Sequence, residues 1–127
     1  MTAQILVVED TPANMKLVSL LLGKAGYRVL QANNARDGMA LAQVHLPDLI
    51  LMDIQLPGMD GLTATRLLKE SPATAQIRIV ALTAFAMQGD EERILAAGCD
   101  GYIAKPIQYK NFLAEVQRML PASPSFK

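Results

Sequence analysis

The sequence predicts a single α/β domain whose doubly wound parallel sheet of five strands is flanked by five helices. Short aliphatic runs alternate with longer segments in which apolar residues recur at helical spacing. The connections between them are short, which favours crossover packing on both faces of one sheet. The chain has 127 residues, 51% of them hydrophobic, enough for one core but too few for two comfortable ones.

The expected strands are the five aliphatic runs. Three of these runs are apolar on both faces, as strands buried in the middle of a parallel sheet are. The runs cover Ile5–Val8, Tyr27–Ala32, Leu49–Met52, Ile77–Leu82 and Gly101–Ala104.

The segments between the strands carry apolar stripes typical of amphipathic helices. Thr11 and Pro12 predict the start of the first helix, with a hydroxyl cap and a proline in the first turn, and Asn34 is expected to cap the second. Gly26 and Gly98 stand where helices commonly end on a left-handed residue. The start and stop signals therefore agree with the alternation of strand and helix.

Composition excludes several classes of protein. Twelve basic and twelve acidic side chains give no net charge, so nothing favours nucleic acid or an anionic membrane. Cys99 is the only cysteine, which excludes an internal disulfide and a cysteine-rich zinc site and suits a reducing compartment. No apolar stretch approaches a membrane span, and the amino end does not resemble a signal peptide. We therefore expect a cytoplasmic domain over residues 1–120, followed by a flexible tail over 121–127.

Polar residues collect where the expected strands end. Glu9 and Asp10 follow the first strand, Asp53 the third, Thr83 the fourth and Lys105 the fifth. The carboxyl ends of parallel strands share one edge of an open sheet, where they form a crevice at the topological switch point. We therefore expect these five side chains to converge.

Such a crevice predicts a metal and a phosphoryl group. Three carboxylates opposed only by Lys105 repel one another and require a further cation. Oxygen donors without sulfur or imidazole suit Mg²⁺. A hydroxyl at Thr83, the ammonium of Lys105 and a divalent metal would each meet a different oxygen of a phosphoryl group bound to Asp53.

Taken singly, these residues have simpler interpretations. Asp53 could open the turn at Pro57–Gly58, and Thr83 could cap a helix that begins near Ala86. Glu9 and Asp10 could merely favour the amino end of the first helix. Their coincidence at the ends of separate strands favours the shared site.

The four segments "VVEDTP", "LILMDIQLPGMDG", "ALTAFAM" and "GYIAKPI" resemble the receiver domain of two-component response regulators, in that family's order and spacing. The resemblance extends from about Gln4 to about Leu120. It implies a flavodoxin-like and CheY-like sheet with strand order 2-1-3-4-5. It also implies that the chain switches protein contacts in a phosphorelay and is not an enzyme.

The resemblance implies a role for each matching residue. Asp53 would accept a phosphoryl group from a histidine kinase or a histidine phosphotransfer protein. Glu9 and Asp10 would position Mg²⁺, Asp10 more directly, with Asp53 and the backbone carbonyl of Gln55 as further ligands.

The remaining matches concern the response to phosphorylation. Thr83 and Lys105 would contact the phosphoryl oxygens, and Tyr102 occupies the aromatic switch position, although it could also be ordinary strand packing. The Lys105–Pro106 peptide bond would be cis, and Ala84 would leave the site accessible. Downstream proteins would bind the face formed by the fourth helix, fifth strand and fifth helix.

Several alternatives stay open. The chain could be a stand-alone regulator, or a receiver from a larger regulator or hybrid kinase. A Mg²⁺-dependent phosphotransferase using Asp53 as a nucleophile would usually carry a second aspartate where Gln55 stands. A flavodoxin-like cofactor binder would need a phosphate-cradling loop, and "EDTPAN" is acidic there. We also hypothesise that Phe85 shields the phosphoryl group from water.

Overall fold

The computed structural model describes residues 3–84 and 88–120, so Phe85 and the expected tail at 121–127 lie outside the described part. Within it, five parallel strands form one sheet in the order β2-β1-β3-β4-β5, as expected. The strands are β1 (Gln4–Val8), β2 (Arg28–Ala32), β3 (Leu49–Asp53), β4 (Arg78–Thr83) and β5 (Gly101–Ala104). The helices between and after them are α1 (Pro12–Lys24), α2 (Ala35–His45), α3 (Gly61–Glu70), α4 (Gln88–Ala96) and α5 (Tyr109–Met119).

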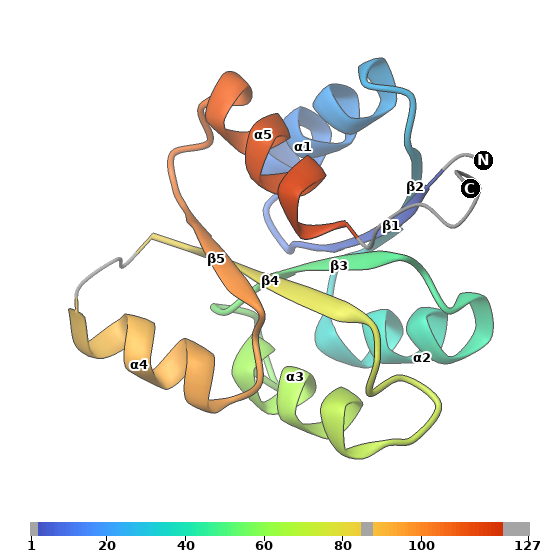
Figure 1. The fold of residues 1–127 in the computed structure, drawn as a ribbon, viewed down its shortest axis with the longest axis vertical. Coiled ribbons are helices and arrows are strands. Elements are labelled where there is room, and N and C mark those ends of the chain that lie inside the picture. The colour runs from blue at the N-terminus through green and yellow to red at the C-terminus, as the bar shows by residue number, and fades with distance from the viewer. Residues whose placement is uncertain (1–2, 85–87, 121–127) are drawn as a thin grey trace.

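Helices cover both faces of the sheet. Helices α1 and α5 lie on one face, and α2, α3 and α4 lie on the other (Figure 1). Successive residues of a strand point to opposite faces, so each central strand supplies both cores. The core on the α1/α5 face contains Ile5, Val7, Leu49, Leu51, Val80, Leu82 and Ile103, and the opposite core contains Leu6, Val8, Ile50, Met52, Ile79 and Ala81.

Two strands extend one residue further at their carboxyl ends than the aliphatic pattern predicts. Asp53 is the last residue of β3 and Thr83 the last of β4, whereas both were expected just beyond their strands. Asp53 pairs with Leu82, and Thr83 pairs with Ala104. The ladder joins backbone groups, so pairing continues after the side chains change from apolar to polar.

The helix ends agree with the sequence signals except at Thr11. The Asn34 side chain accepts from the backbone N–H of Asp37 at 2.8 Å, which confirms the predicted cap. Thr11 is the N-cap residue of α1, but its hydroxyl makes no cap hydrogen bond, so the predicted hydroxyl cap is wrong. Its backbone N–H instead donates to Glu9 Oε2 at 3.1 Å. The carboxylate thus satisfies a donor just before the helix begins.

Glycines with positive φ follow two helices. Gly26 has φ 95° after α1, and Gly98 has φ 108° after α4, both in the region that favours glycine.

Helix α1, with 13 residues, is the longest one described. Among the described segments, no helix combines the length and the apolar character needed to cross a membrane.

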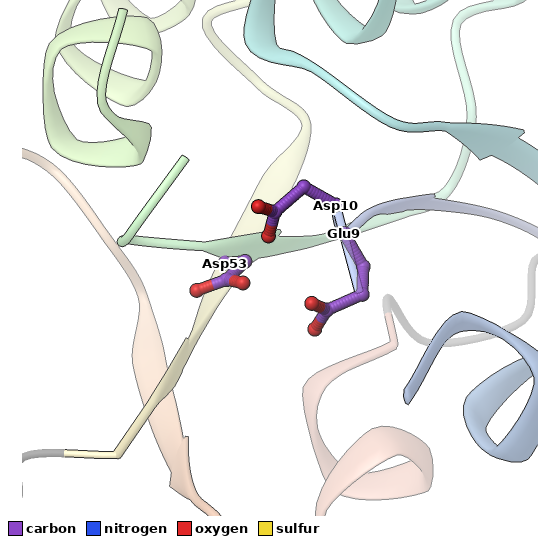
Figure 2. A group of neighbouring side chains, drawn as sticks. All are labelled: Glu9, Asp10 and Asp53. Carbon is purple, nitrogen blue, oxygen red and sulfur yellow. The ribbon is translucent and has the colours of Figure 1, made fainter. Parts of the chain in front are cut away.

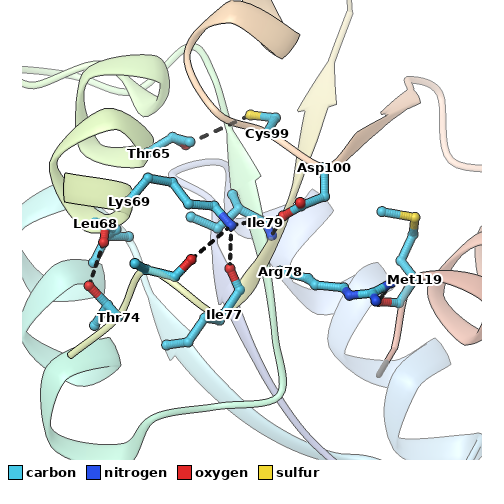
Figure 3. A network of polar contacts seen from close by, with 11 residues as sticks. Thr65, Leu68, Lys69, Thr74, Ile77, Arg78, Ile79, Cys99, Asp100 and Met119 are labelled. Carbon is cyan, nitrogen blue, oxygen red and sulfur yellow. Dashed lines mark hydrogen bonds and ion pairs between the residues drawn. The ribbon is translucent and has the colours of Figure 1, made fainter. Parts of the chain in front are cut away.

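A polar network fastens the amino ends of β4 and β5 (Figure 3). Lys69 Nζ on α3 donates to the Ile77 carbonyl at 2.7 Å and pairs with Asp100 Oδ2 at 3.0 Å. The same carboxylate oxygen accepts from the Ile79 backbone N–H at 2.8 Å. One lysine therefore joins α3, the loop before β4 and the residue before β5.

Replacing Lys69 by methionine should lower the free energy of unfolding by about 1–3 kcal/mol, because Asp100 and the Ile77 carbonyl lose a charged donor. Urea denaturation measures this change. Lys16→Met is the matched control, since Lys16 is exposed on α1, and it should leave the unfolding midpoint within about 0.5 kcal/mol. Equal stability of the two variants would show that the network contributes nothing.

Candidate functional site

The alternation of side chains along the strands brings three charged residues to the same side of the sheet edge. Glu9, Asp53 and Lys105 each stand two residues beyond a strand residue whose side chain lies in the α1/α5 core. Because side chains repeat every two residues in a strand, all three continue that face past the last core layer. Their strands are β1, β3 and β5, which the fold brings together at the carboxyl edge.

The expected convergence of the carboxylates is present. Glu9, Asp10 and Asp53 each offer an oxygen, and these oxygens lie within 4.8 Å of one another. Figure 2 shows the three side chains at the end of the strands, with those of Glu9 and Asp10 leaving β1 in different directions. Glu9 and Asp53 are buried, with exposed fractions of 1% and 4%, whereas Asp10 is exposed. The cluster therefore opens to solvent on the side of Asp10.

Lys105 lies between the two buried carboxylates. Its Nζ is 3.0 Å from Glu9 Oε1 and 3.2 Å from Asp53 Oδ2. The backbone N–H of Lys105 donates to the Thr83 carbonyl at 2.8 Å, which extends the β4–β5 pairing to this residue. This backbone hydrogen bond fixes Lys105 just beyond the end of β5, from where its ammonium group reaches the two carboxylates.

The electrostatics of the site favour a proton or a cation on its carboxylates. The pKa of Asp53 is raised from 3.8 to about 6: burial raises it most and Glu9 raises it as well, while the Gln55 backbone amide and Lys105 lower it. Burial lowers the pKa of Lys105, but the Glu9 and Asp53 carboxylates outweigh it, and the pKa is raised overall. Lys105 thus stays charged, and its single positive charge faces two carboxylates, Glu9 and Asp53.

The residues fit a hard divalent cation. All the ligands on offer are oxygens, and no cysteine or histidine belongs to this cluster of described residues. Glu9 Oε1 is buried and, among the described residues, accepts no well-directed hydrogen bond, so its contact with Lys105 is an ion pair. A buried oxygen with spare capacity in a cluster of carboxylates suits an additional cation.

The loop after β3 is held close to Asp53. The backbone N–H of Gln55 donates to Asp53 Oδ1 at 2.9 Å, and the Asp60 side chain caps α3 by accepting from the Thr63 N–H at 2.8 Å. A Cβ on Gly61 would lie 2.1 Å from the carbonyl oxygen of Asp53 and 2.8 Å from Ile54 Cα. No side chain fits there, so α3 begins directly against the backbone of Asp53.

Sequence reasoning did not single out Gly61. The signal was present, because the quoted segment "LILMDIQLPGMDG" ends on this residue. A glycine directly after a helix-capping aspartate marks a close approach of two backbone segments.

The other predicted positions lie around this cluster. Thr83 is fully buried at the end of β4, with Ala84 exposed next to it. The helix start expected near Ala86 lies outside the described residues, and the structure describes α4 from Gln88 on. Tyr102 is half-buried on β5, and the Lys105–Pro106 peptide bond is cis.

Comparison with known proteins identifies the class to which this fold and site belong. The family model of the response regulator receiver domain matches residues 5–117, and the chain belongs to this family. It is a receiver domain of two-component signalling. The polar-differentiation response regulators DivK of Brucella ovis and Brucella suis are 44% identical to it over 120 residues, 94% of this chain and 98% of theirs. The segments "VVEDTPANMKL" and "DLILMDIQLPGMDG" resemble the same protein.

Solved structures agree. The receiver domain of the sensor histidine kinase PA1611 from Pseudomonas aeruginosa, which has a magnesium ion coordinated in its active-site cleft, is 37% identical, with a TM-score of 0.87 over 94% of this chain and 98% of its own. The chemotaxis response regulator CheY4 of Vibrio cholerae is 28% identical, with a TM-score of 0.90 over 94% of this chain and all of its own. The predicted CheY-like fold is confirmed.

Gly61→Ala should destabilise the domain by about 2–3 kcal/mol, because the new methyl group must displace the Asp53 backbone or the start of α3. Gly23→Ala is the matched control: nothing lies within 4 Å of its Cβ position in α1. The control should raise stability by about 0.5 kcal/mol through helix propensity. Urea unfolding of both variants measures the difference, and a Gly61→Ala variant as stable as wild type would contradict the close approach.

Proposed function

We propose that this receiver domain accepts a phosphoryl group on Asp53 from a phosphohistidine and thereby switches its contacts with other proteins. The observation that carries the proposal is the pairing of a buried acceptor carboxylate with Lys105 inside a cluster of three carboxylates. The phosphohistidine donor would come from a histidine kinase or a histidine phosphotransfer protein. Residues 1–120 would form the receiver, and a stand-alone regulator is the form we favour, by its similarity to DivK over nearly all of that protein's length.

Transfer of the phosphoryl group from the phosphohistidine to Asp53 needs no other reactant. The phosphorus–nitrogen bond of the phosphohistidine breaks, an oxygen of Asp53 forms the new bond to phosphorus, and the imidazole nitrogen keeps the electron pair. Lys105 lies 3.2 Å from Asp53 Oδ2, where its charge would offset the charge of the incoming oxygens. The Gln55 N–H fixes the other oxygen of Asp53 and so orients the acceptor.

Glu9, Asp10 and Asp53, with the backbone carbonyl of Gln55, would hold Mg²⁺. When bound, the cation supplies positive charge that keeps the carboxylates ionised and neutralises phosphoryl oxygens. Glu9 is buried, with one oxygen beside Lys105 and the other accepting from the Thr11 N–H, whereas Asp10 is exposed. Asp10 would therefore be the more direct ligand of the pair.

Phosphorylation would act on Thr83 and Tyr102. The phosphoryl group adds a charge of about −1.5 to −2 and strong acceptors, which favour a conformation in which the Thr83 hydroxyl and Lys105 approach it. Rotation of Tyr102 would then alter the face formed by α4, β5 and α5, where a downstream protein would bind.

Gln55 stands where an aspartyl-phosphate phosphotransferase usually carries a second aspartate, so we propose a phosphoacceptor and not a turnover enzyme. Its site of action would be the cytoplasm.

Incubation with acetyl phosphate and Mg²⁺ should add one phosphoryl group to the wild-type protein and none to Asp53→Asn. Intact-protein mass measures the gain, which should require Mg²⁺ and be lost at alkaline pH. Asp60→Asn is the control for a neighbouring aspartate, since the amide oxygen can still cap α3, and it should still be phosphorylated. A phosphoryl group on Asp53→Asn, or no gain in wild type with either acetyl phosphate or a phosphohistidine donor, would overturn the proposal.

Asp10→Asn should lower the affinity for Mg²⁺ at least tenfold. Mg²⁺ should raise the thermal midpoint of the wild type, because a ligand that binds the folded state stabilises it. Asp10→Asn should be at least as stable as wild type without Mg²⁺, since one of three like charges is gone, yet respond little to the metal. Glu70→Gln is the control, since Glu70 is exposed at the end of α3, and Mg²⁺ should raise its thermal midpoint as much as that of the wild type. An equal rise in Asp10→Asn would show that Asp10 is not a ligand.

A further inference from the structure

The strand β2 forms one outer edge of the sheet. Among the described strands it pairs only with β1, and helices α1 and α2 lie beside it on the two faces (Figure 1). The central strands β1 and β3 are almost wholly buried, whereas Val29 and Leu30 of β2 are half-buried and Gln31 is exposed. Solvent therefore reaches this edge between the two helices.

Two hydrogen bonds show which backbone groups of β2 face outward. The Arg28 N–H donates to the Ala3 carbonyl at 2.9 Å, and the Ala32 carbonyl accepts from the N–H of the first residue after β1 at 3.0 Å. Both ends of β2 are thus bonded toward β1. Because alternate residues of a strand direct their backbone groups to opposite edges, the N–H and carbonyl groups of Val29 and Gln31 point away from the sheet.

These outward-facing groups lack the usual protection of an edge strand. Natural sheet edges are commonly shielded by a lysine, a proline, a bulge or a very short strand. Val29 and Gln31 are uncharged, and the pairing of β2 with β1 runs through all five residues of the strand without a bulge. The opposite edge strand, β5, has four residues and is followed closely by Pro106. The β2 edge is therefore the one that offers free donors and acceptors to another extended segment.

A cavity of about 650 Å³ adjoins the carboxyl end of this edge, between α1 and α2. Its described lining combines apolar side chains with three carboxylates and contains no lysine, arginine or histidine. Met15 and Leu41 supply apolar surface. Glu9 and Asp10 belong to the acceptor cluster, whereas Asp37 lies on α2 outside it, so a cation bound in that cluster would leave the charge of Asp37 available. The cavity suits a long side chain with an apolar stem and a positive end.

From the open edge and the acidic cavity we propose that β2 is a docking site for an extended, basic segment of a partner protein. The segment pairs with the backbone groups of Val29 and Gln31 as an added strand. Its arginine or lysine lays the stem along Met15 and Leu41 and the charge beside Asp37. Main-chain hydrogen bonds give such recognition its affinity, and the side chain gives it selectivity. The site is separate from the α4/β5/α5 face and needs no phosphoryl group on the acceptor.

The test uses a short peptide of alternating valine and threonine with an arginine at each end, blocked at both termini, with Mg²⁺ present throughout. NMR titration of the isotope-labelled full chain measures its affinity, and amide hydrogen exchange locates the contact. In the free protein the Val29 and Gln31 amides should exchange faster than the Leu30 amide, which faces β1. The peptide should slow exchange at Val29 and Gln31 by about tenfold or more.

Four variants separate backbone pairing from side-chain contacts. Gln31→Pro removes an outward N–H but no bond to β1, and should weaken peptide binding by about fivefold or more. Gln31→Ala keeps that N–H and loses only the 2.7 Å side-chain bond to Ser19 Oγ, so it should bind as wild type does. Asp37→Asn should weaken binding about threefold, whereas Glu92→Gln, which removes an exposed charge on α4, should not. Urea unfolding establishes that each variant is folded.

Two altered peptides leave the protein unchanged and so keep the test independent of folding. A peptide with N-methylated valines cannot form the ladder, and one with glutamate in place of arginine meets like charge in the cavity; neither should bind. Equal binding of either peptide would overturn the proposal, as would no binding of the arginine peptide. Binding that leaves exchange at Val29 and Gln31 unchanged would overturn it too. None of these results bears on the phosphorylation of Asp53, which intact-protein mass measures separately.

Discussion

The arrangement at the carboxyl edge depends on keeping two carboxylates next to each other where water has little access. Glu9 and Asp53 are both buried, and Lys105 is 3.0–3.2 Å from each of them. One ammonium group cannot balance two buried carboxylates and the exposed Asp10 beside them, and burial, with Glu9 beside it, raises the pKa of Asp53 although Lys105 lowers it. Under the proposed function, a cation would make up this deficit, and with that cation the site would receive a dianionic group.

The carboxylate cluster and the two residues proposed to respond to phosphorylation continue opposite faces of the sheet. Glu9, Asp53 and Lys105 continue the α1/α5 face, whereas Thr83 and Tyr102 continue the face beneath α2, α3 and α4. The two sets meet at the edge, where the backbone N–H of Lys105 donates to the Thr83 carbonyl. Under the proposed function, a change at the acceptor would reach α4 across the end of β4, by a short path of packed and hydrogen-bonded neighbours.

The convergence of Glu9, Asp10 and Asp53 could be predicted from the sequence, because the carboxyl ends of parallel strands share an edge. The strand order came from the resemblance to the receiver family. The contact between Lys105 and Glu9 could not be predicted, since it depends on rotamers and on which face each residue continues. The missing hydroxyl cap at Thr11 also depends on a rotamer, that of the Thr11 side chain, which the sequence does not specify. Gly61 was missed because its importance comes from the close approach of its backbone to that of Asp53, which appears only in the folded chain.

The Lys69 network lies at the other end of the same strands. Asp100 and Lys69 hold the residues around Ile77 and Ile79, while the acceptor cluster begins where β4 ends at Thr83. Four residues of strand from Ile79 to Thr83 span about 13 Å, beyond the range over which substitutions usually influence one another. The Lys69 network thus contributes to the free energy of folding at a distance from the acceptor cluster. Selection for stability, in a relative living at another temperature, can change residues of the amino edge and leave the acceptor cluster unchanged.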